Sequence, residues 1–237
     1  MIPLLKISGF VLLAMSVAGA RAQDTLQAQV VRWNDTMELK GPTRHLGKLI
    51  AYSMTIGPGQ GEGSILTGAD QLFILKEGSL DAVLNDQEPK HLGPGGICLL
   101  LAGDRVQFSA GDTAAVLYRC TFFVRNVPFS DLNYHTSILA DWSDLKRKSG
   151  IRDIFKEPTR FLGNVNMRVI TLRGRNHPAV NGTEEIILVS RGKIRVQVGD
   201  KTLDASTGDL VYVPSGVVCG LRNTGNATAQ YFEIQWR

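Results

Sequence analysis

The chain carries the same short sequence twice. Residues 42–47 read Pro-Thr-Arg-His-Leu-Gly, and residues 158–163 read Pro-Thr-Arg-Phe-Leu-Gly. Similar residues follow each copy at nearly the same spacing. The matched pairs are 54–56 with 170–172, Gln71 with Glu185, and Gly96 with Gly208. A repeated unit of about eighty residues is much longer than a solenoid repeat, so the duplication predicts two related small domains. Residues that chemistry requires can then persist in one copy and be lost from the other.

The first 22 residues have the pattern of a secretion signal. Lys6 gives the positive start, residues 7–20 form an apolar stretch, and Ala20-Arg21-Ala22 forms a small-x-small cleavage site. We expect a signal peptide at residues 1–22, a mature chain that begins at Gln23, and export to the periplasm or the extracellular space. The apolar stretch is shorter than a bilayer-spanning helix, so we expect no stable membrane insertion.

The charge of the chain argues against some classes of partner. The formal net charge is +4 at pH 7, and removal of Lys6 and Arg21 with the signal peptide leaves +2. This excess is too small to favour nucleic acid or an anionic membrane surface. We expect a small molecule as the binding partner, and the sequence leaves a homodimer open.

Three cysteines, Cys98, Cys120 and Cys219, are few for an exported protein. At most one disulfide can form, which leaves one thiol over. Cys98 and Cys120 lie in apolar, strand-like segments, which favours buried free thiols. A Cys98–Cys120 bridge is the alternative.

Strand signals dominate the chain. The segment Lys-Ile-Arg-Val-Gln-Val at 193–198 alternates polar and apolar residues, and residues 71–75 and 185–189 are continuous apolar strands of the kind buried on both faces. Turn sequences separate the strands at 111–112, 199–200 and 223–226. Short strands with frequent turns predict an all-β sandwich or barrel.

The segment between the two copies has a different pattern. Residues 143–150 begin with a capping Ser143, continue with an acid and then bases, and end at Gly150, which predicts one short helix. The domains are therefore expected at 23–124 and 157–237, with a helical connector at 125–156.

The second copy contains residues with a recognisable spacing. They are Glu185 and Gly192, followed by Gly208, the Pro-Ser-Gly turn at 214–216, Cys219 and Asn223. This spacing resembles the two motifs of the cupin superfamily, whose members fold as small jelly-roll barrels. The resemblance covers the second half well and the first half weakly, so the whole chain is similar to a two-domain cupin, or bicupin. It is also similar to a group of exported bacterial cupins. The resemblance implies two tandem jelly-roll barrels.

In metal-binding cupins, the residue three positions after the turn glycine is a histidine, and two more histidines precede the glutamate. Such a set suits Fe, Mn, Ni or Zn. Here the four positions hold Pro178 or Ala179, Val180 or Asn181, Glu185, and Cys219. Only the glutamate remains in place, and His177 lies nearby. We expect no metal cofactor, and if a divalent transition metal such as Fe, Mn or Zn does bind, the candidate ligands are His177, Glu185 and Cys219.

The first copy departs further from the pattern. Gln71 replaces the glutamate, Leu66 and Thr67 stand where histidines would, and Gln107 replaces the last ligand. We expect this barrel to be structural, so that Gln71→Leu changes no ligand or metal property.

The period-2 alternation of a strand places Glu185 in the barrel interior with Ile187 and Val189. Its neighbour Glu184 is expected on the solvated side. A buried carboxylate requires a partner. The candidates are a metal, Arg168 or Arg222, or the hydroxyl of Tyr212.

Two hypotheses about function follow. In the first, the protein is an exported bicupin with a decayed metal centre that binds a small polar molecule in the C-terminal barrel. Its pocket would be lined by Glu185, Ile187, Val189, Tyr212, Cys219 and Leu221. In the second, it is a metal-dependent oxygenase, isomerase or lyase that uses a rearranged set of His177, Glu185 and Cys219. The sequence names neither a substrate nor a catalytic residue.

Overall fold

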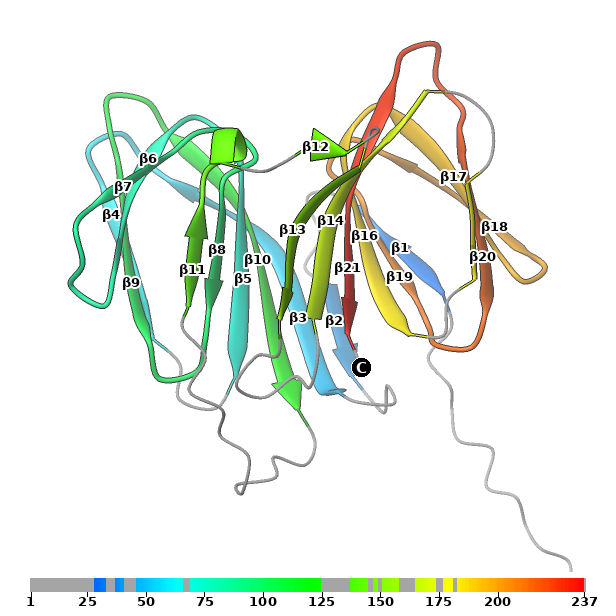
Figure 1. The fold of residues 1–237 in the computed structure, drawn as a ribbon, viewed down its shortest axis with the longest axis horizontal. Helices are drawn as coiled ribbons and strands as arrows, with labels where there is room; N and C mark the ends of the chain where they lie inside the picture. Colours follow the sequence, from blue (N-terminus) through cyan, green and yellow to red (C-terminus); the bar gives the residue numbers. More distant parts are fainter. Residues whose placement is uncertain are drawn as a thin grey trace, which may run out of the picture.

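The computed structural model of the chain describes residues 28–32, 37–40, 46–65, 69–124, 137–144, 147–148, 151–157, 165–173, 177–180 and 183–236. The predicted signal peptide and its cleavage site lie outside these residues. The described residues form four antiparallel sheets, arranged as two barrels side by side (Figure 1). The all-β prediction is confirmed.

The N-terminal barrel has a six-stranded sheet in the order β11-β8-β5-β10-β3-β2 and a four-stranded sheet in the order β4-β9-β6-β7. Its strands are β2 (Met37–Lys40), β3 (Leu46–Ile56), β4 (Gly61–Ile65), β5 (Asp70–Glu77), β6 (Leu80–Leu84), β7 (Lys90–Leu92), β8 (Ile97–Leu100), β9 (Arg105–Ala110), β10 (Ala115–Val124) and β11 (Ile138–Ala140). Strand β9 alternates exposed and buried residues, as expected for a strand with one face on a core and one in water.

The C-terminal barrel repeats this design. Its seven-stranded sheet has the order β1-β19-β16-β21-β14-β13-β12, and its four-stranded sheet has the order β15-β20-β17-β18. Its strands are β1 (Gln29–Val31), β12 (Arg147–Lys148), β13 (Ile151–Glu157), β14 (Val165–Leu172), β15 (His177–Val180), β16 (Glu184–Arg191), β17 (Lys193–Val198), β18 (Lys201–Ser206), β19 (Leu210–Val213), β20 (Val218–Asn223) and β21 (Ala229–Trp236). Strands β12 and β13 belong to this sheet, although they lie in the segment that the sequence marks as a connector.

Each barrel includes a strand from outside its predicted sequence range. Strand β1 precedes the N-terminal barrel in sequence but pairs with β19 of the C-terminal barrel, where the blue ribbon lies among yellow and orange strands (Figure 1). Strand β11 precedes the C-terminal barrel but pairs with β8 of the N-terminal one. Just beyond β1, Arg32 forms an ion pair with the buried Asp209, with Nη1 and Oδ2 2.5 Å apart. Each barrel therefore contains a strand from outside its own sequence unit.

Three apolar clusters fill the molecule. One fills the interior of the N-terminal barrel, and another fills the interior of the C-terminal barrel. The third lies between the barrels, where β3, β5 and β10 face β14, β16 and β21. In this third cluster the rings of Phe122 and Trp236 pack edge to face with centroids 5.7 Å apart. Each large sheet is therefore covered on both faces.

Strand registers confirm the internal duplication. Leu117 pairs with Met54 and Leu75, and Tyr231 pairs in the same way with Ile170 and Val189. The predicted match of 54–56 with 170–172 therefore holds in three dimensions.

One landmark is displaced by a residue. The N–H of Gly95 donates to the carbonyl of Leu75, and the N–H of Gly208 donates to that of Val189, both at 2.7 Å. Both glycines have positive φ, 89° and 96°, which a residue with a Cβ rarely adopts. Gly208 thus corresponds to Gly95, and the predicted match with Gly96 is wrong.

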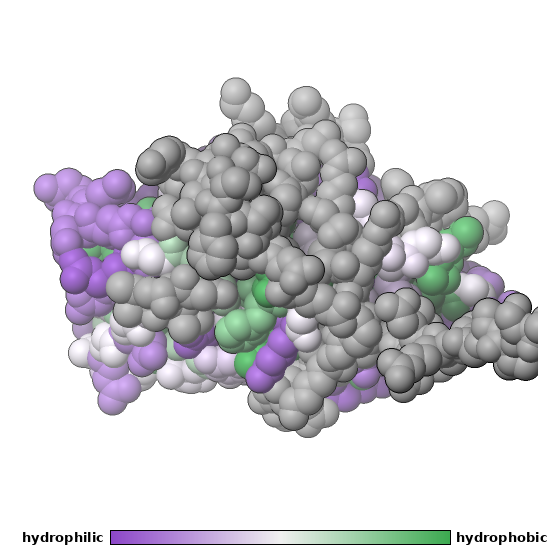
Figure 2. All heavy atoms as spheres, turned by 90° about the horizontal axis from the view of Figure 1, so that it is seen from below, coloured by the Kyte–Doolittle hydropathy of each residue, from purple (hydrophilic) through white to green (hydrophobic). Residues whose placement is uncertain are grey.

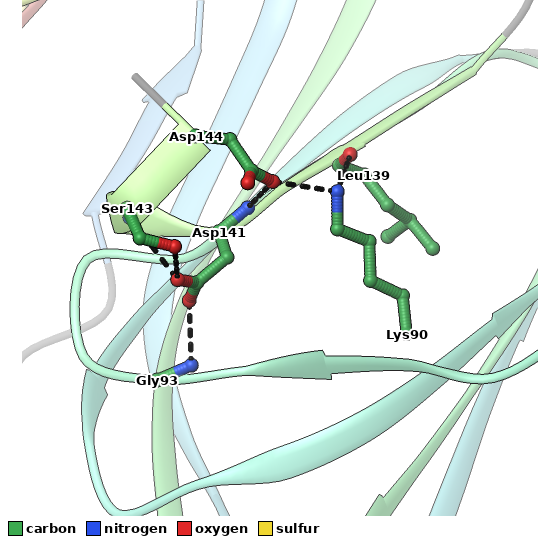
Figure 3. Close-up of polar contacts among 6 residues, drawn as sticks. All are labelled: Lys90, Gly93, Leu139, Asp141, Ser143 and Asp144. Carbon is green, nitrogen blue, oxygen red and sulfur yellow. Dashed lines mark hydrogen bonds and ion pairs between the residues drawn. The ribbon is translucent and has the colours of Figure 1, made fainter. Parts of the chain in front are cut away.

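The predicted helix at 143–150 is not formed in the described residues. A 3-10 turn covers Trp142–Asp144, and Arg147 and Lys148 form β12, which pairs with β13. The carboxylate of Asp141 accepts hydrogen bonds from the Ser143 hydroxyl at 2.6 Å and from the N–H of Gly93 at 2.9 Å (Figure 3). The basic residues that suggested the end of a helix are used to extend a sheet edge.

A second contact fixes the same turn to the N-terminal barrel. The ammonium of Lys90 on β7 lies 2.7 Å from the carboxylate of Asp144 and donates to the carbonyl of Leu139 at 3.1 Å (Figure 3). The ring of Trp142 meets that of Phe232 in the C-terminal barrel, with centroids 6.2 Å apart. The turn therefore contacts both barrels.

All three cysteines are buried and free. Cys98 lies in the interior of the N-terminal barrel, whereas Cys120 lies in the cluster between the barrels. The two side chains occupy opposite faces of one sheet, so the prediction of free thiols is confirmed and the alternative of a Cys98–Cys120 bridge is wrong.

The surface is mostly polar where it is described. Seen from below, the end of the N-terminal barrel at the left of Figure 2 is hydrophilic. Among the described residues, Val218 is the one large hydrophobic side chain that is strongly exposed, at 63%. No helix in the described segments has the length and apolar character needed to cross a membrane.

Candidate functional site

Glu185 lies at the start of β16 and is fully buried. Its strand partner Gln235 on β21 lies directly opposite, and the amide Nε2 of Gln235 donates to the carboxylate Oε2 at 3.0 Å. Directly opposite residues of an antiparallel pair project from the same face of the sheet. Glu185 therefore has a hydrogen-bond donor from the neighbouring strand.

A second buried carboxylate lies two residues earlier on β21. Glu233 is 1% exposed and forms a charge-assisted hydrogen bond with the Nε of Arg168, its partner on β14. The side chain of Arg168 is 31% exposed. Burial disfavours its charge, but the hydrogen bond and charge of Glu233, together with the charge of Glu185, raise the pKa of the guanidinium. The two acids and the arginine therefore form one electrostatic group.

Tyr231 and Cys219 adjoin this group. Burial, followed by the charges of Glu233 and Glu185, raises the pKa of the Tyr231 phenol. Its hydroxyl is buried and has no hydrogen-bond partner among the described residues. Burial, followed by the charges of Glu185 and Glu233, raises the pKa of Cys219 to about 12. Both groups are therefore neutral at physiological pH.

Four more predicted pocket residues belong to the same interior. Ile187, Val189, Cys219 and Leu221 all lie in the apolar cluster inside the C-terminal barrel. The site is therefore a polar group, formed by Arg168, Glu185, Tyr231, Glu233 and Gln235, against an apolar wall.

Tyr212, which was predicted to line the same pocket, lies outside it. It lies in the cluster between the barrels, and its hydroxyl donates to Glu184 at 3.4 Å. Strand β19 is buried along its whole length, and its inward residues are Val211 and Val213, so Tyr212 points the other way.

The expected position of Glu184 is also wrong. It is 2% exposed and accepts a hydrogen bond from the indole Nε1 of Trp236 at 2.8 Å. The sheet that carries it packs against the other barrel, so both of its faces are buried. Arg222, proposed as a partner for Glu185, is exposed to solvent.

Comparison with known proteins fits this architecture. A family model described as a cupin domain matches residues 173–235, which carry most of the site. The C-terminal barrel is a cupin domain. The matches among solved structures extend over both barrels and show that both have this fold.

Similar solved structures include the protein Ylba from E. coli, with a TM-score of 0.69 at 12% sequence identity, covering 91% of this chain and 95% of that one. A putative glyoxylate-induced protein from Pseudomonas aeruginosa has a TM-score of 0.68 at 12% identity, with coverage of 92% and 93%. An oxalate decarboxylase from Bacillus subtilis has a TM-score of 0.65 at 13% identity, with coverage of 89% and 78%. No curated protein sequence matches the chain significantly. At these identities the matches establish the fold only.

The described residues of the C-terminal barrel do not fit a metal ion. Within them, no group of three or more His, Cys, Asp or Glu side chains is arranged to hold one. Burial and the charges of Glu185 and Glu233 disfavour the thiolate form of Cys219, which is the form that binds a metal. In the backbone ladder His177 lies opposite Leu221, and Ala179 lies opposite Cys219. The side chain of His177 is outside the described part.

The N-terminal barrel has a polar group of its own. Gln71 corresponds to Glu185, and its Oε1 accepts hydrogen bonds from Ser64 Oγ at 2.9 Å and from Arg119 Nε at 3.1 Å. Arg119 also donates from Nη1 to the Tyr52 hydroxyl at 3.0 Å and from Nη2 to Ser64 at 3.1 Å. The barrel that we expected to be structural therefore contains a buried polar group, although the family's motif residues are absent from it.

The predicted correspondence of Gln107 is also displaced by one residue. On β9 Val106 pairs with Leu84 and is fully buried, whereas Gln107 is exposed. By strand register Val106 occupies the place of Cys219, and Ser64, its partner on β4, occupies the place of Ala179.

Sequence reasoning missed Arg119 and Glu233, although a signal was available. Strand β21 has polar residues at 233 and 235, and β10 has them at 119 and 121, each separated by one apolar residue. A polar residue at every second position of an apolar strand indicates a shared face. Both strands are buried on their apolar side, so their polar face had to line an interior.

A separate cleft of about 450 Å³ lies between the barrels. Its lining includes Trp142 and Phe232 on the apolar side and Lys76 and Arg191 among the polar residues. It contains none of the residues of the Glu185 group. The buried charges lie inside the barrel, and burying a charge costs more free energy than lining a cleft with exposed polar groups. We therefore take the barrel interior as the candidate site.

Proposed function

We propose that the protein is a bicupin that acts by binding a small polar molecule inside its C-terminal barrel. The observation that carries this proposal is the buried group of Glu185, Glu233 and Arg168, with the Tyr231 hydroxyl left without a partner in the described residues. Buried charges cost free energy, and well-packed apolar side chains are often as stable or more stable. Binding explains why the barrel retains them.

The chemistry of the group points to a ligand with both donors and acceptors. The carboxylates accept hydrogen bonds, the partly exposed Arg168 donates them, and the Tyr231 hydroxyl can do either. Ile187, Val189 and Leu221 supply an apolar wall. Sugars and hydroxylated organic acids combine these properties, so we propose this class of ligand.

We also propose that this binding occurs outside the cytoplasm, because residues 1–22 have the pattern of a signal peptide. Intact-mass measurement of protein from the envelope fraction tests this directly. A mature chain that starts at Gln23 is expected, and a chain that retains residues 1–22 would exclude it.

The binding test is a thermal-shift screen with sugars, sugar acids and hydroxy acids, followed by calorimetry on any hit. Glu185→Gln and Tyr231→Phe should weaken the binding of a hit, because each removes a polar group of the site while preserving its shape. Glu88→Gln, which alters an exposed acid of the other barrel, is the matched control. A hit whose affinity is unchanged in Glu185→Gln and Tyr231→Phe would place binding elsewhere.

The alternative function is a metal-dependent oxygenase, isomerase or lyase. It is supported by Glu185 at the motif position and by the pairing of β15, which carries His177, with β20, which carries Cys219. Elemental analysis of untagged protein separates the two functions. We expect much less than one equivalent of transition metal, and no change in melting temperature with a chelator. Near-stoichiometric Fe, Mn or Zn that is lost in both Cys219→Ser and His177→Ala would establish the metal enzyme instead.

A further inference from the structure

The arginine inside the N-terminal barrel has only neutral partners. Its three hydrogen bonds go to the oxygens of Gln71, Tyr52 and Ser64. Among the residues that the structure describes, no carboxylate forms an ion pair with Arg119. This contrasts with Arg168 in the other barrel, which pairs with Glu233. The positive charge of Arg119 is therefore not balanced within this group.

The amide of Gln71 is held with its nitrogen unused. Because arginine only donates, its bond to Gln71 fixes the amide oxygen toward the guanidinium and excludes the flipped orientation. The Nε2 of Gln71 is then a buried donor with no partner in the described residues. Gln71 is fully buried. An orphaned buried donor costs free energy and calls for an explanation, such as a bound water, ion or ligand.

Arg119 has donors to spare as well. A guanidinium has five N–H groups, one on Nε and two on each terminal nitrogen. Nε is used by Gln71, and each terminal nitrogen makes one hydrogen bond, so one N–H remains on Nη1 and one on Nη2. Two N–H groups on one guanidinium match the two oxygens of a carboxylate.

The surroundings limit what can bind there. The guanidinium carbon lies 5.4 Å from the centre of the Phe73 ring and 5.8 Å from that of Tyr52. These contacts hold the guanidinium by cation–π attraction and line the position with carbon. Gln71 and Ser64 are buried, whereas Arg119 and Tyr52 are half-buried. The group is therefore closed at the end formed by Gln71 and Ser64 and reaches solvent at the other end.

We propose that the interior of the N-terminal barrel is a second ligand site, which binds a small organic carboxylate on Arg119 and Gln71. The two remaining N–H groups of the arginine receive the carboxylate, and the Gln71 amide donates a further hydrogen bond. The aromatic rings accept the carbon end of the acid, which favours a carboxylate over inorganic phosphate. This site is independent of the one proposed in the C-terminal barrel.

The test is calorimetric titration of the mature protein with acetate, malonate and succinate, with inorganic phosphate and acetamide as separate probes. At least one carboxylate should bind saturably, and acetamide should not bind, because it has no charge. Arg119→Met should weaken carboxylate binding by at least about tenfold, since it removes the charge-assisted hydrogen bonds. Arg105→Met, an exposed arginine on β9 of the same barrel, is the matched control and should bind as the parent does.

Gln71→Glu keeps the test decisive if Arg119→Met does not fold. The new carboxylate would accept the same two hydrogen bonds, balance the guanidinium and remove the orphaned amide nitrogen. It should therefore raise the melting temperature and abolish carboxylate binding. Glu185→Gln should leave this binding unchanged, which separates the two barrels.

Three results would overturn the proposal. They are absence of carboxylate binding to the parent protein, unchanged binding in both Arg119→Met and Gln71→Glu, and loss of binding in Glu185→Gln alone. Tighter binding of phosphate than of any carboxylate would overturn the assigned ligand class.

Discussion

Arg119 and Glu233 occupy the same position in the two barrels but carry opposite charges. Arg119 lies on β10 opposite Tyr52 of β3, and Glu233 lies on β21 opposite Arg168 of β14. Those strand pairs correspond to one another in the duplicated fold. The interiors therefore differ in charge although the backbone pairing is the same.

The pair of Arg168 and Glu233 should be important for stability. Arg168→Met leaves the buried Glu233 carboxylate without its charged partner. Breaking a buried ion pair often costs about 3–5 kcal/mol, and because Arg168 is 31% exposed, solvent reduces the expected loss to about 2 kcal/mol in the free energy of unfolding. Urea unfolding measures it. Arg195→Met, which removes an exposed pair with Asp204, should change stability little. Equal effects of the two substitutions would contradict the role assigned to the buried pair.

Asp141 should contribute to the acid sensitivity of the fold. Hydrogen bonds from the Ser143 hydroxyl and the Gly93 N–H lower the pKa of its carboxyl to about 2. Because the folded pKa lies below the unfolded value of about 3.9, the stabilisation is present above pH 4 and is lost as the pH falls toward 2.

Asp141→Asn should therefore be less stable than the parent at pH 6, and its stability should fall less between pH 4 and pH 2. Denaturant unfolding across this range measures both effects. Asp200→Asn, in an exposed turn, is the control and should follow the parent curve. If the free energy of unfolding of Asp141→Asn falls as steeply as that of the parent between pH 4 and pH 2, the turn does not depend on this carboxylate.

The three cysteines should be unreactive in the folded protein. Burial raises the pKa of Cys120 to about 12 and that of Cys98 further, and burial with the charges of Glu185 and Glu233 raises that of Cys219 to about 12. The thiolate is the reactive form, so alkylation at pH 8 should be slow in the native state and complete after denaturation. Mass spectrometry should find three labels on each chain denatured without reductant. A smaller number would indicate a disulfide.

Much of the fold could be predicted from the sequence, because period-2 alternation and spaced turns report strands directly. The inward position of Glu185 also followed from this pattern. The prediction of a helix in the connector was wrong because of a tertiary interaction. Its cap and charge pattern favoured a helix, but the edge of β13 provides backbone hydrogen bonds for Arg147 and Lys148.

The face of the sheet on which Tyr212 and Glu184 lie could not be predicted from the sequence of their own strands. Strands β16 and β19 are apolar on both faces, so alternation does not show which face lines the barrel and which meets the other barrel. Arg119 could have been found, because it interrupts an apolar strand. The neutral surroundings of Arg119 could not have been predicted, because Ser64 and Tyr52 come from β4 and β3, which are distant in sequence.

A buried hydrogen bond between two strands of the C-terminal barrel should stabilise the sheet that faces the other barrel. The indole Nε1 of Trp236 donates to Glu184 Oε2 at 2.8 Å, and both residues are buried between the large sheets. Trp236→Phe retains an aromatic ring against Phe122 but removes the donor. Loss of a hydrogen bond to a buried charged group should lower the free energy of unfolding by about 1–3 kcal/mol.

A double-mutant cycle with Glu184→Gln isolates the bond from the loss of ring area. The Gln side chain still accepts a hydrogen bond but carries no charge, so the bond weakens without a change of shape. We expect a coupling energy of about 1 kcal/mol between the two positions, measured by urea unfolding of the four proteins. If the two effects add to within about 0.5 kcal/mol, the bond contributes nothing measurable to the stability of this sheet. Coupling would show that Glu184, although adjacent to Glu185, stabilises the pairing of β16 with β21 through its bond to Trp236.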